Sequence, residues 1–234
     1  MKTQQEIDAI LAERRQRDAK IFYIDPERVT DAAAADDGIA IFRRKKLFGL
    51  FRAGTEVLPC IYDAIEPLGD AFYLISVQGQ QALYDLTAGR FITGYDVAAV
   101  SRSAGSLRLT GADGKCGLLD TYSRAMIVPP VYDEVGDLNY SSPYVWVRRG
   151  DSFHYVRVAD GCLLSMPMLV MAFDGGDGLY GMRSDGTVAL FSEQGTSLLM
   201  EYRRRCIAAG GRIRLQNFVR RLEVVADVYG NIIN

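Results

Sequence analysis

The chain repeats one short motif, a small residue followed by two large apolar residues, about every 35 residues. The motif is clear at Gly49-Leu50-Phe51, Ala82-Leu83-Tyr84, Gly117-Leu118-Leu119 and Ala189-Leu190-Phe191, and weaker at His154-Tyr155-Val156 and Val224-Val225-Ala226. Its starting positions 49, 82, 117, 154, 189 and 224 differ by 33, 35, 37, 35 and 35 residues. Such a period is typical of repeat proteins in which each unit is one supersecondary element. It predicts six units within residues 38–234.

Each motif follows a run of alternating apolar and polar residues and a turn signal, which together indicate a β-hairpin. The expected turns are residues 43–46, 78–80, 113–114, 150–151, 184–186 and 217–221. A third, shorter segment ends in a tyrosine in four units; Pro59, Pro129 and Pro130 make it an edge or broken strand, because proline cannot donate a ladder hydrogen bond. We therefore expect an all-β repeat domain with little helix and with Leu50, Leu83, Leu118 and Leu190 buried at equivalent positions.

The first residues favour a helix. Thr3 and Glu6 form a capping box, and Ile7, Ile10 and Leu11 follow at helical spacing, which predicts a helix over residues 3–18. The helix either packs on the main domain through these three apolar residues or serves as a docking helix for a partner. Residues 31–37 read as a linker, so we expect a helix and linker arm over 1–37 and a six-unit β-repeat domain over 38–234.

The last unit ends before its third segment. Residues 21–24, an apolar stretch with Tyr23 near Asp25, resemble that segment in character. We expect them to supply the missing strand and close the repeats into a propeller-like ring, since closure removes exposed sheet edges. The alternative is an open twisted array.

Two units carry a more specific pattern. Cys116-Gly117-Leu118-Leu119-Asp120 leads to Ile127-Val128-Pro129-Pro130-Val131-Tyr132-Asp133, and Phe48-Gly49-Leu50-Phe51 leads to Val57-Leu58-Pro59-Cys60-Ile61-Tyr62-Asp63. These units resemble the WG-repeat family, whose pattern is Trp-Gly, an apolar residue and often Asp, then Val-Ile-Pro-Pro-x-Tyr-Asp. The signature tryptophan is replaced by Phe48, Gln81, Cys116 and Val188. The resemblance covers about residues 38–234 and implies an interaction array without known catalysis, in a family widespread in bacteria.

Composition and charge narrow the function classes. The 27 basic and 29 acidic residues give a net charge of −2, without the basic excess typical of nucleic-acid-binding proteins. The longest nearly continuous apolar stretch, residues 166–173, is too short for a membrane span of about 20 residues, and the first residues lack a secretory signal pattern. His154 is the only histidine, and the four cysteines form no CxxC pair, so no zinc site or other cofactor is expected. We expect a cytoplasmic protein with reduced, mostly buried thiols.

Several candidate sites have a structural explanation that we favour. Tyr62, Tyr95 and Tyr132 are each followed by aspartate; three copies of one pair favour tyrosine packing between units and aspartates that accept N–H groups at turns. His154 sits at a repeat position, and Trp146 alternates along a strand, so both are expected to pack. The glycine-rich residues 174–178 hold two carboxylates and lack the later glutamate of a calcium loop. Residues 149–151 spell Arg-Gly-Asp, which we expect to be a hairpin turn.

Three basic clusters are the candidate partner-binding residues. They contain Arg43 and Arg44, Arg203 and Arg204, and Arg220 and Arg221, and two of the clusters fall on expected hairpin turns. If these turns share one rim, they form a local basic patch suited to an acidic partner. The alternative is that they are solvated turn charges.

The favoured function is a non-catalytic interaction module that binds another protein. Repeat units bury their apolar faces against one another and leave a broad surface free, and the usual nucleophile and phosphate-binding motifs are missing from the sequence. The first alternative is a small-ligand receptor or enzyme with a central pocket. The second is an immunity or regulatory protein that neutralises another bacterial protein.

Overall fold

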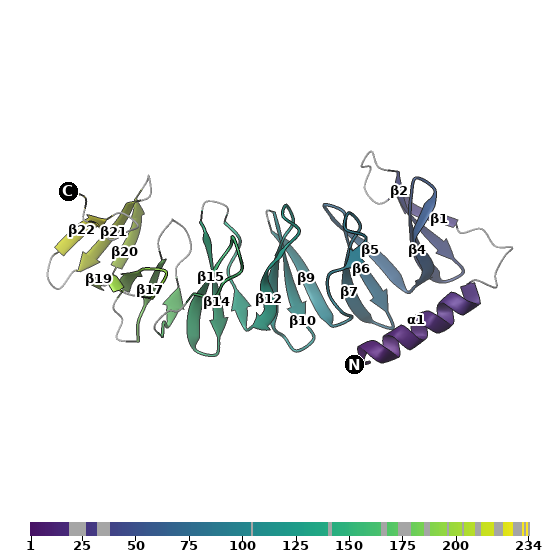
Figure 1. Cartoon of the computed structure of the whole chain (residues 1–234), viewed down its shortest axis with the longest axis horizontal. Coiled ribbons are helices and arrows are strands. Elements are labelled where there is room, and N and C mark those ends of the chain that lie inside the picture. The colour runs from purple at the N-terminus through teal and green to yellow at the C-terminus, as the bar shows by residue number, and fades with distance from the viewer. Residues whose placement is uncertain are drawn as a thin grey trace. The chain divides into compact units, whose positions relative to one another are not determined.

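The computed structural model is mainly antiparallel β-structure with one helix at the N-terminus (Figure 1). It describes residues 1–18, 27–31 and 38–234, except 104, 140–141, 165–167, 173–178, 185–187, 196, 203, 209–211, 218–221, 227–230, 232 and 234. Only the backbone is described for the strand residues 27–31, 180, 197–202, 204–208, 212–217, 222–224 and 226. The chain divides into two compact units, Met1–Ala99 and Val100–Asn234.

Helix α1 (Gln4–Asp18) begins where the capping box places it. The Thr3 backbone N–H donates to the Glu6 carboxylate at 2.7 Å, and the Glu6 N–H donates to Thr3 Oγ1 at 3.3 Å. These two bonds satisfy donors that a helix start would otherwise leave without partners. Thr3 is therefore the cap rather than the first helical residue of the predicted 3–18 helix.

The first unit contains two antiparallel sheets. The first has the order β1-β2-β3-β4, with bounds β1 (Glu27–Asp31), β2 (Ile39–Arg44), β3 (Leu47–Arg52) and β4 (Thr55–Tyr62). The next strands along the chain are β5 (Ala64–Gly69), β6 (Phe72–Val77), β7 (Gln80–Asp85) and β8 (Arg90–Phe91), and neighbours in this series pair with one another. Strand β9 (Val97–Ser103) pairs with β7 at Gln81–Val97 and runs across the unit boundary.

The second unit continues the pattern with four sets of antiparallel strands. The first has β9 followed by β10 (Ser106–Gly111), β11 (Cys116–Asp120) and β12 (Met126–Tyr132), and the second has β13 (Glu134–Val135), β14 (Tyr144–Arg149) and β15 (Ser152–Arg157). The third has β16 (Met171–Ala172), β17 (Leu179–Met182), β18 (Val188–Phe191) and β19 (Ser197–Tyr202), and the fourth has β20 (Arg204–Ala208), β21 (Arg212–Asn217) and β22 (Leu222–Ala226).

Hairpins occur at all the positions where the turn residues predicted them. The paired arms are β2–β3, β6–β7, β10–β11, β14–β15, β17–β18 and β21–β22. Residues 185–187 and 218–221 of the last two turns lie outside the described residues, although the strands on both sides are placed. Within the described part of residues 38–234 there is no helix, as expected. The repeat leucines are fully buried: Leu50, Leu83 and Leu190 are 0% exposed and Leu118 is 1% exposed.

Three hairpins share one register with their third strand. The residue before the small repeat position opposes the third-strand tyrosine, as in the pairs Phe48–Tyr62, Cys116–Tyr132 and Val188–Tyr202. In all three the register shifts directly after this pair and again after the repeat leucine. The third strand is therefore a bulged strand, and β4, β12 and β19 each lie at the end of their strand order. This matches the expectation for β4 and β12, which carry Pro59, Pro129 and Pro130; β19 lies at the end of its strand order without a proline.

Each sheet gains a strand that the sequence patterns did not predict. Strands β5, β9 and β13 begin directly after the Tyr-Asp pairs and precede the next hairpin, and β20 follows Tyr202 in the same way. At Tyr62-Asp63 and Tyr132-Asp133 the chain leaves one sheet and enters the next, whereas at Tyr95-Asp96 it stays in the sheet that contains both β7 and β9. These strands were missed because they are short or interrupted, for example by Pro67 in β5 and by the two-residue length of β13.

Three apolar clusters form the cores. The first contains Ile7 and Leu11 of α1 together with residues of β2 to β7, so the helix is part of the core of the first unit. The second joins β11 and β12 to β13, β14 and β15. The third joins β15 to β17 and β18. The helix therefore packs on the sheets, which is the first of the two interpretations drawn from its sequence.

The closing strand predicted at residues 21–24 and most of the linker predicted at 31–37 lie outside the described residues. The strand placed between them, β1, pairs with β2 in the first sheet. Closure of the repeats into a ring stays a prediction.

Candidate functional site

The three tyrosines of the Tyr-Asp pairs and two of the aspartates have the structural roles expected of them. Tyr62, Tyr95 and Tyr132 are 1%, 5% and 7% exposed, and burial raises the pKa of the Tyr62 and Tyr95 hydroxyls. The Asp63 carboxylate accepts the backbone N–H of Gln78, and that of Asp133 accepts the N–H of Gly150 at 2.6 Å. Both donors lie in the turn of the next hairpin. These two aspartates therefore tie neighbouring sheets together.

The other isolated candidates are also placed in structural surroundings. His154 is half-buried in β15 opposite Val147, and desolvation, followed by the charge of Arg149, lowers its pKa. Trp146 is half-buried, packs against the third core, and lies 5.5 Å from Phe153 between ring centroids. Residues 149–151 form the end of β14 and the hairpin turn. The glycine-rich residues 174–178 lie outside the described residues.

The thiols differ from the expectation in one case. Cys60 is buried and Cys116 is half-buried, but Cys162 is exposed in the turn that follows β15. The expectation of mostly buried thiols is wrong for Cys162: its backbone carbonyl accepts the Arg157 N–H, and its side chain lies exposed at the surface. The side chain of Cys206 is not described.

The predicted basic residues fall into different surroundings. Arg43 and Arg44 lie in strand β2, so the β2–β3 turn is narrower than predicted and consists of Lys45 and Lys46. Arg204 begins β20, with only its backbone described, and Arg203, Arg220 and Arg221 lie outside the described residues. Among the three predicted clusters, only the first, with Arg43 and Arg44, therefore has side chains in the described part of the chain.

A basic pocket of about 320 Å³ lies at this cluster, between the end of α1 and the β2–β3 turn. Its lining contains four cationic side chains, one carboxylate and two apolar or weakly polar groups: Arg14, Arg17, Arg44, Lys45, Asp18, Leu47 and Cys60. We call it the basic pocket. Among the described lining residues, four cations stand against one carboxylate, and Arg14 and Arg17 also pair with Asp63 and Glu13.

Two arginines of the basic pocket are held in fixed positions. Arg44 Nη1 lies 2.6 Å from Asp18 Oδ1, and both side chains are only 16% exposed. Arg14 Nη1 donates to the Ile61 carbonyl at 2.8 Å, and its Nη2 lies 3.0 Å from Asp63 Oδ1. Because both pairs are partly shielded from water, they orient the guanidinium groups more effectively than exposed pairs do. The hydrogen bond and charge of Asp18 raise the pKa of Arg44, which stays cationic.

One donor of Arg44 has no partner. Arg44 Nε is buried, and no acceptor for it exists among the described residues. A buried N–H without an acceptor costs free energy. Cys60 lies on the wall of the basic pocket, and burial raises the pKa of its thiol to about 11. The thiol is therefore protonated near neutral pH and adds no negative charge.

A second pocket of about 300 Å³ lies in the second unit. It is lined by side chains of β10, β11, β13 and β14 and of the residues that follow β13: Arg108, Cys116, Glu134, Val135, Gly136, Asp137 and Trp146. Arg108 Nη2 lies 2.9 Å from Asp137 Oδ1, and Glu134 pairs with Arg148 at 2.9 Å. Positive and negative groups nearly balance here, so this pocket has weaker charge selectivity than the basic pocket.

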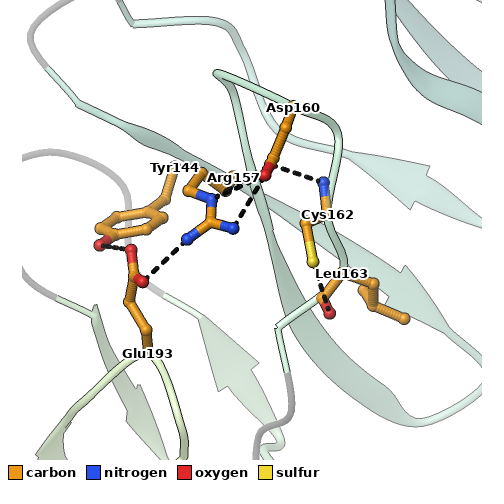
Figure 2. A network of polar contacts seen from close by, with 6 residues as sticks. All are labelled: Tyr144, Arg157, Asp160, Cys162, Leu163 and Glu193. Atoms are coloured by element: carbon orange, nitrogen blue, oxygen red, sulfur yellow. Dashed lines mark hydrogen bonds and ion pairs between the residues drawn. The ribbon is translucent and has the colours of Figure 1, made fainter.

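A polar network links the fourth and fifth hairpins within the second unit (Figure 2). Glu193 accepts a hydrogen bond from the Tyr144 hydroxyl at 2.7 Å and pairs with Arg157 Nη1 at 2.9 Å. Arg157 also binds Asp160 through Nη2 at 2.8 Å, and Asp160 accepts the Cys162 N–H at 3.0 Å. Figure 2 shows these groups facing one another, with the arginine between the two carboxylates. The charges are paired among themselves, which indicates a structural junction rather than a ligand site.

Among the described residues there is no cluster of three or more histidine, cysteine or acidic side chains arranged to hold a metal ion. No helix in the described part of the chain is both long enough and apolar enough to cross a membrane.

Comparison with known proteins gives no assignment. No family model matches the chain. No curated protein is similar to it. Solved structures share only a weak likeness: BamB from Moraxella catarrhalis is 16% identical with a TM-score of 0.35, over 84% of this chain and 70% of that one. BBS1N, in a complex with ARL6DN, is 12% identical with a TM-score of 0.33, over 88% and 81%. Hsv2 of Kluyveromyces lactis is 13% identical with a TM-score of 0.32, over 82% and 72%. TM-scores this low support no inference about fold or function.

Sequence reasoning identified part of the basic pocket and missed the rest. The cluster containing Arg44 was predicted as a binding turn, but Arg14, Arg17 and Cys60 were not connected with it. Asp18 and Arg44 are 26 residues apart, and Arg14 and Asp63 are 49 apart, so only the folded chain brings them together. The basic residues Arg15 and Arg17 in the last turn of α1 are the signal in the sequence that pointed to a charged site at this end of the helix.

Proposed function

We propose that the protein is a non-catalytic β-repeat module that binds another protein, built from six WG-like hairpin units. The observation that carries the proposal is that three hairpins pair with their third strand in the same register. Phe48, Cys116 and Val188 each oppose a third-strand tyrosine, and in all three hairpins the pairing register shifts directly after this pair and again after the repeat leucine. Residues at equivalent positions of the hairpins therefore have the same structural role in each unit, whereas an active site would need different residues to meet at one place. This is the organisation of repeat proteins that present a surface to a partner.

The chemistry of the candidate groups also favours binding over catalysis. Catalytic nucleophiles and bases need pKa values matched to their task. The Cys60 thiol has a raised pKa and the Tyr62 hydroxyl is buried with a raised pKa, so neither group is activated. The carboxylates of Asp63 and Asp133 are occupied by turn N–H groups and by cations. The basic pocket, in contrast, presents charge without an adjacent reactive group.

The proposal predicts a stable partner in the native cell. The full chain with an affinity tag is used to capture proteins from the native cell, and quantitative mass spectrometry identifies them. A specific protein should be enriched relative to capture with a tagged variant that folds in the same way but has an altered basic pocket. We choose Lys45→Gln combined with Arg17→Gln as that variant, because both side chains line the basic pocket and Arg17 is exposed. Enrichment by the natural chain and its loss in the variant are expected. Turnover of a small molecule without any enriched protein would overturn the proposal.

A further inference from the structure

The aspartate directly after β4 holds the second hairpin through two hydrogen bonds and also pairs with a cation. The Asp63 backbone N–H donates to the Ser76 carbonyl at 2.9 Å, and the Asp63 carboxylate accepts the backbone N–H of Gln78. Arg14 of α1 lies against the same carboxylate, with 3.0 Å between Arg14 Nη2 and Asp63 Oδ1. This one residue therefore connects the end of β4, the turn of the second hairpin and the helix.

The aspartate directly after β12 makes the same contacts with the fourth hairpin. The Asp133 N–H donates to the Arg148 carbonyl at 2.9 Å, and the Asp133 carboxylate accepts the N–H of Gly150 at 2.6 Å. The cation is Lys115, whose Nζ lies 2.6 Å from Asp133 Oδ1. In both places the accepted N–H belongs to the first residue of the hairpin turn. We call this set of contacts the aspartate latch.

The length of the turn explains why these two N–H groups are available to the aspartates. Two residues join β6 to β7, and two join β14 to β15; the first residue of each turn has a positive φ, 50° at Gln78 and 58° at Gly150. A two-residue turn is closed by hydrogen bonds of the flanking strand residues, so the N–H of its first residue has no acceptor within the hairpin. The aspartate carboxylate supplies that acceptor.

The remaining Tyr-Asp pair has different surroundings. The turn of the hairpin that follows Asp96 contains four residues, 112–115, and its Gly114 N–H donates to the Gly111 carbonyl of the same hairpin at 2.9 Å. Asp96 is exposed, and the division of the chain into two compact units falls shortly after it, behind Ala99. The Tyr-Asp sequence is therefore combined with a two-residue turn only at Asp63 and Asp133.

The latched hairpins also share their apolar cores. The first cluster contains residues of the first and second hairpins, such as Leu50 and Ile75. The second cluster contains residues of the third and fourth hairpins, such as Leu118 and Val147. In each pair of hairpins, a polar contact at the turn thus accompanies the apolar contact in the core.

We propose that the aspartate latch couples the opening of the first hairpin to that of the second, and the opening of the third to that of the fourth. Segments of a protein open together when the contacts between them are lost in one step, as happens where a turn is bonded to the preceding strand end. Asp63 and Asp133 are the coupling residues, whereas Asp96, at the same position of the repeat, has no such role.

Amide hydrogen exchange of the full chain, followed residue by residue with NMR, tests the latch directly. Amides in exposed hairpin turns ordinarily exchange fast, but a latched amide exchanges only when the strands that hold it open. We expect the Gln78 and Gly150 amides to be protected about as well as β6 and β14. The amide of Ala112, the first residue of the four-residue turn, should exchange much faster.

Variants of the aspartates distinguish coupling from a general loss of stability. Asp133→Ala removes the acceptor and should speed up exchange of the Gly150 amide by at least about tenfold. Exchange in β14 and β15 should also become faster, while β10 and β11 keep their rates. Asp133→Asn keeps an oxygen acceptor and should retain part of the protection. Asp96→Ala is the matched control and should leave the amides of all turns unchanged.

Three results would each overturn the inference. They are a Gly150 amide without protection in the natural chain, an equal increase of exchange in β10–β11 and β14–β15 of Asp133→Ala, and the same effect in Asp96→Ala. If Asp133→Ala fails to fold, the Asp133→Asn variant and the turn amides of the natural chain decide the question.

Discussion

At the residue scale, the small repeat residue is dictated by a close backbone contact. A Cβ atom on Gly117 would lie 2.8 Å from both the Pro130 nitrogen and the Val128 carbonyl oxygen, and one on Gly49 would lie 2.7 Å from the Leu58 carbonyl oxygen. These atoms belong to the bulged third strand, which cannot move without breaking its pairing. The two units therefore need glycine for space and not for its backbone freedom.

Replacing Gly117 with alanine should consequently lower the free energy of unfolding by about 1–3 kcal/mol. The matched control is Ala112→Ser in the turn of the same hairpin, an exposed position where the added hydroxyl faces solvent. We expect that change to cost less than about 0.5 kcal/mol. Urea denaturation of both variants measures the difference, and equal losses would show that the third strand adjusts freely.

The only histidine makes one pH effect attributable to a single group. Desolvation, followed by the charge of Arg149, lowers the pKa of His154 in the folded state, so the unfolded chain binds its proton more tightly. The neutral form favours folding, and stability should fall as the pH drops from about 7.5 through the unfolded-state value of about 6.5. His154→Gln should flatten the pH dependence of the denaturation midpoint over this range. An unchanged slope in the variant would assign the effect to other groups.

At the scale of elements, α1 belongs to the first core although it precedes the repeats in sequence. Ile7 is 0% exposed and Leu11 is 7% exposed, and both join the cluster formed by β2 to β7. The Lys2 carbonyl accepts a hydrogen bond from Gln80 at 3.0 Å, and the Gln4 side chain accepts the Tyr95 N–H at 3.2 Å. The helix thus connects to both sheets of the first unit.

Truncation of Leu11 to alanine should cost about 2–5 kcal/mol of unfolding free energy, because it opens a cavity in this core while keeping a good helix former. Hydrogen exchange should speed up in β4, the strand against which α1 packs. Gln16→Ala, an exposed position on the same helix, is the control and should leave both quantities nearly unchanged. A helix that only tethers a partner would show no such coupling to β4.

At the scale of the whole molecule, the arrangement of the repeats is testable in solution. A closed ring predicted from residues 21–24 should give a radius of gyration of about 17 Å, the value expected for a compact chain of this length. Small-angle X-ray scattering measures it directly. A distinctly larger radius would establish the open array, and it would leave the hairpins and the basic pocket as described.

The sequence by itself determined the local features. Turn residues placed the hairpins and the Thr3–Glu6 pair placed the start of α1, because both depend on residues close in the chain. The repeat leucines identified buried positions because equivalent positions of a repeat have the same burial. Tertiary structure decided the rest. Short strands such as β13 form only because a neighbouring hairpin supplies their hydrogen bonds. The basic pocket exists only because α1 folds back onto β2 and β4, and no local pattern encodes the meeting of Arg14 with Asp63 or of Asp18 with Arg44.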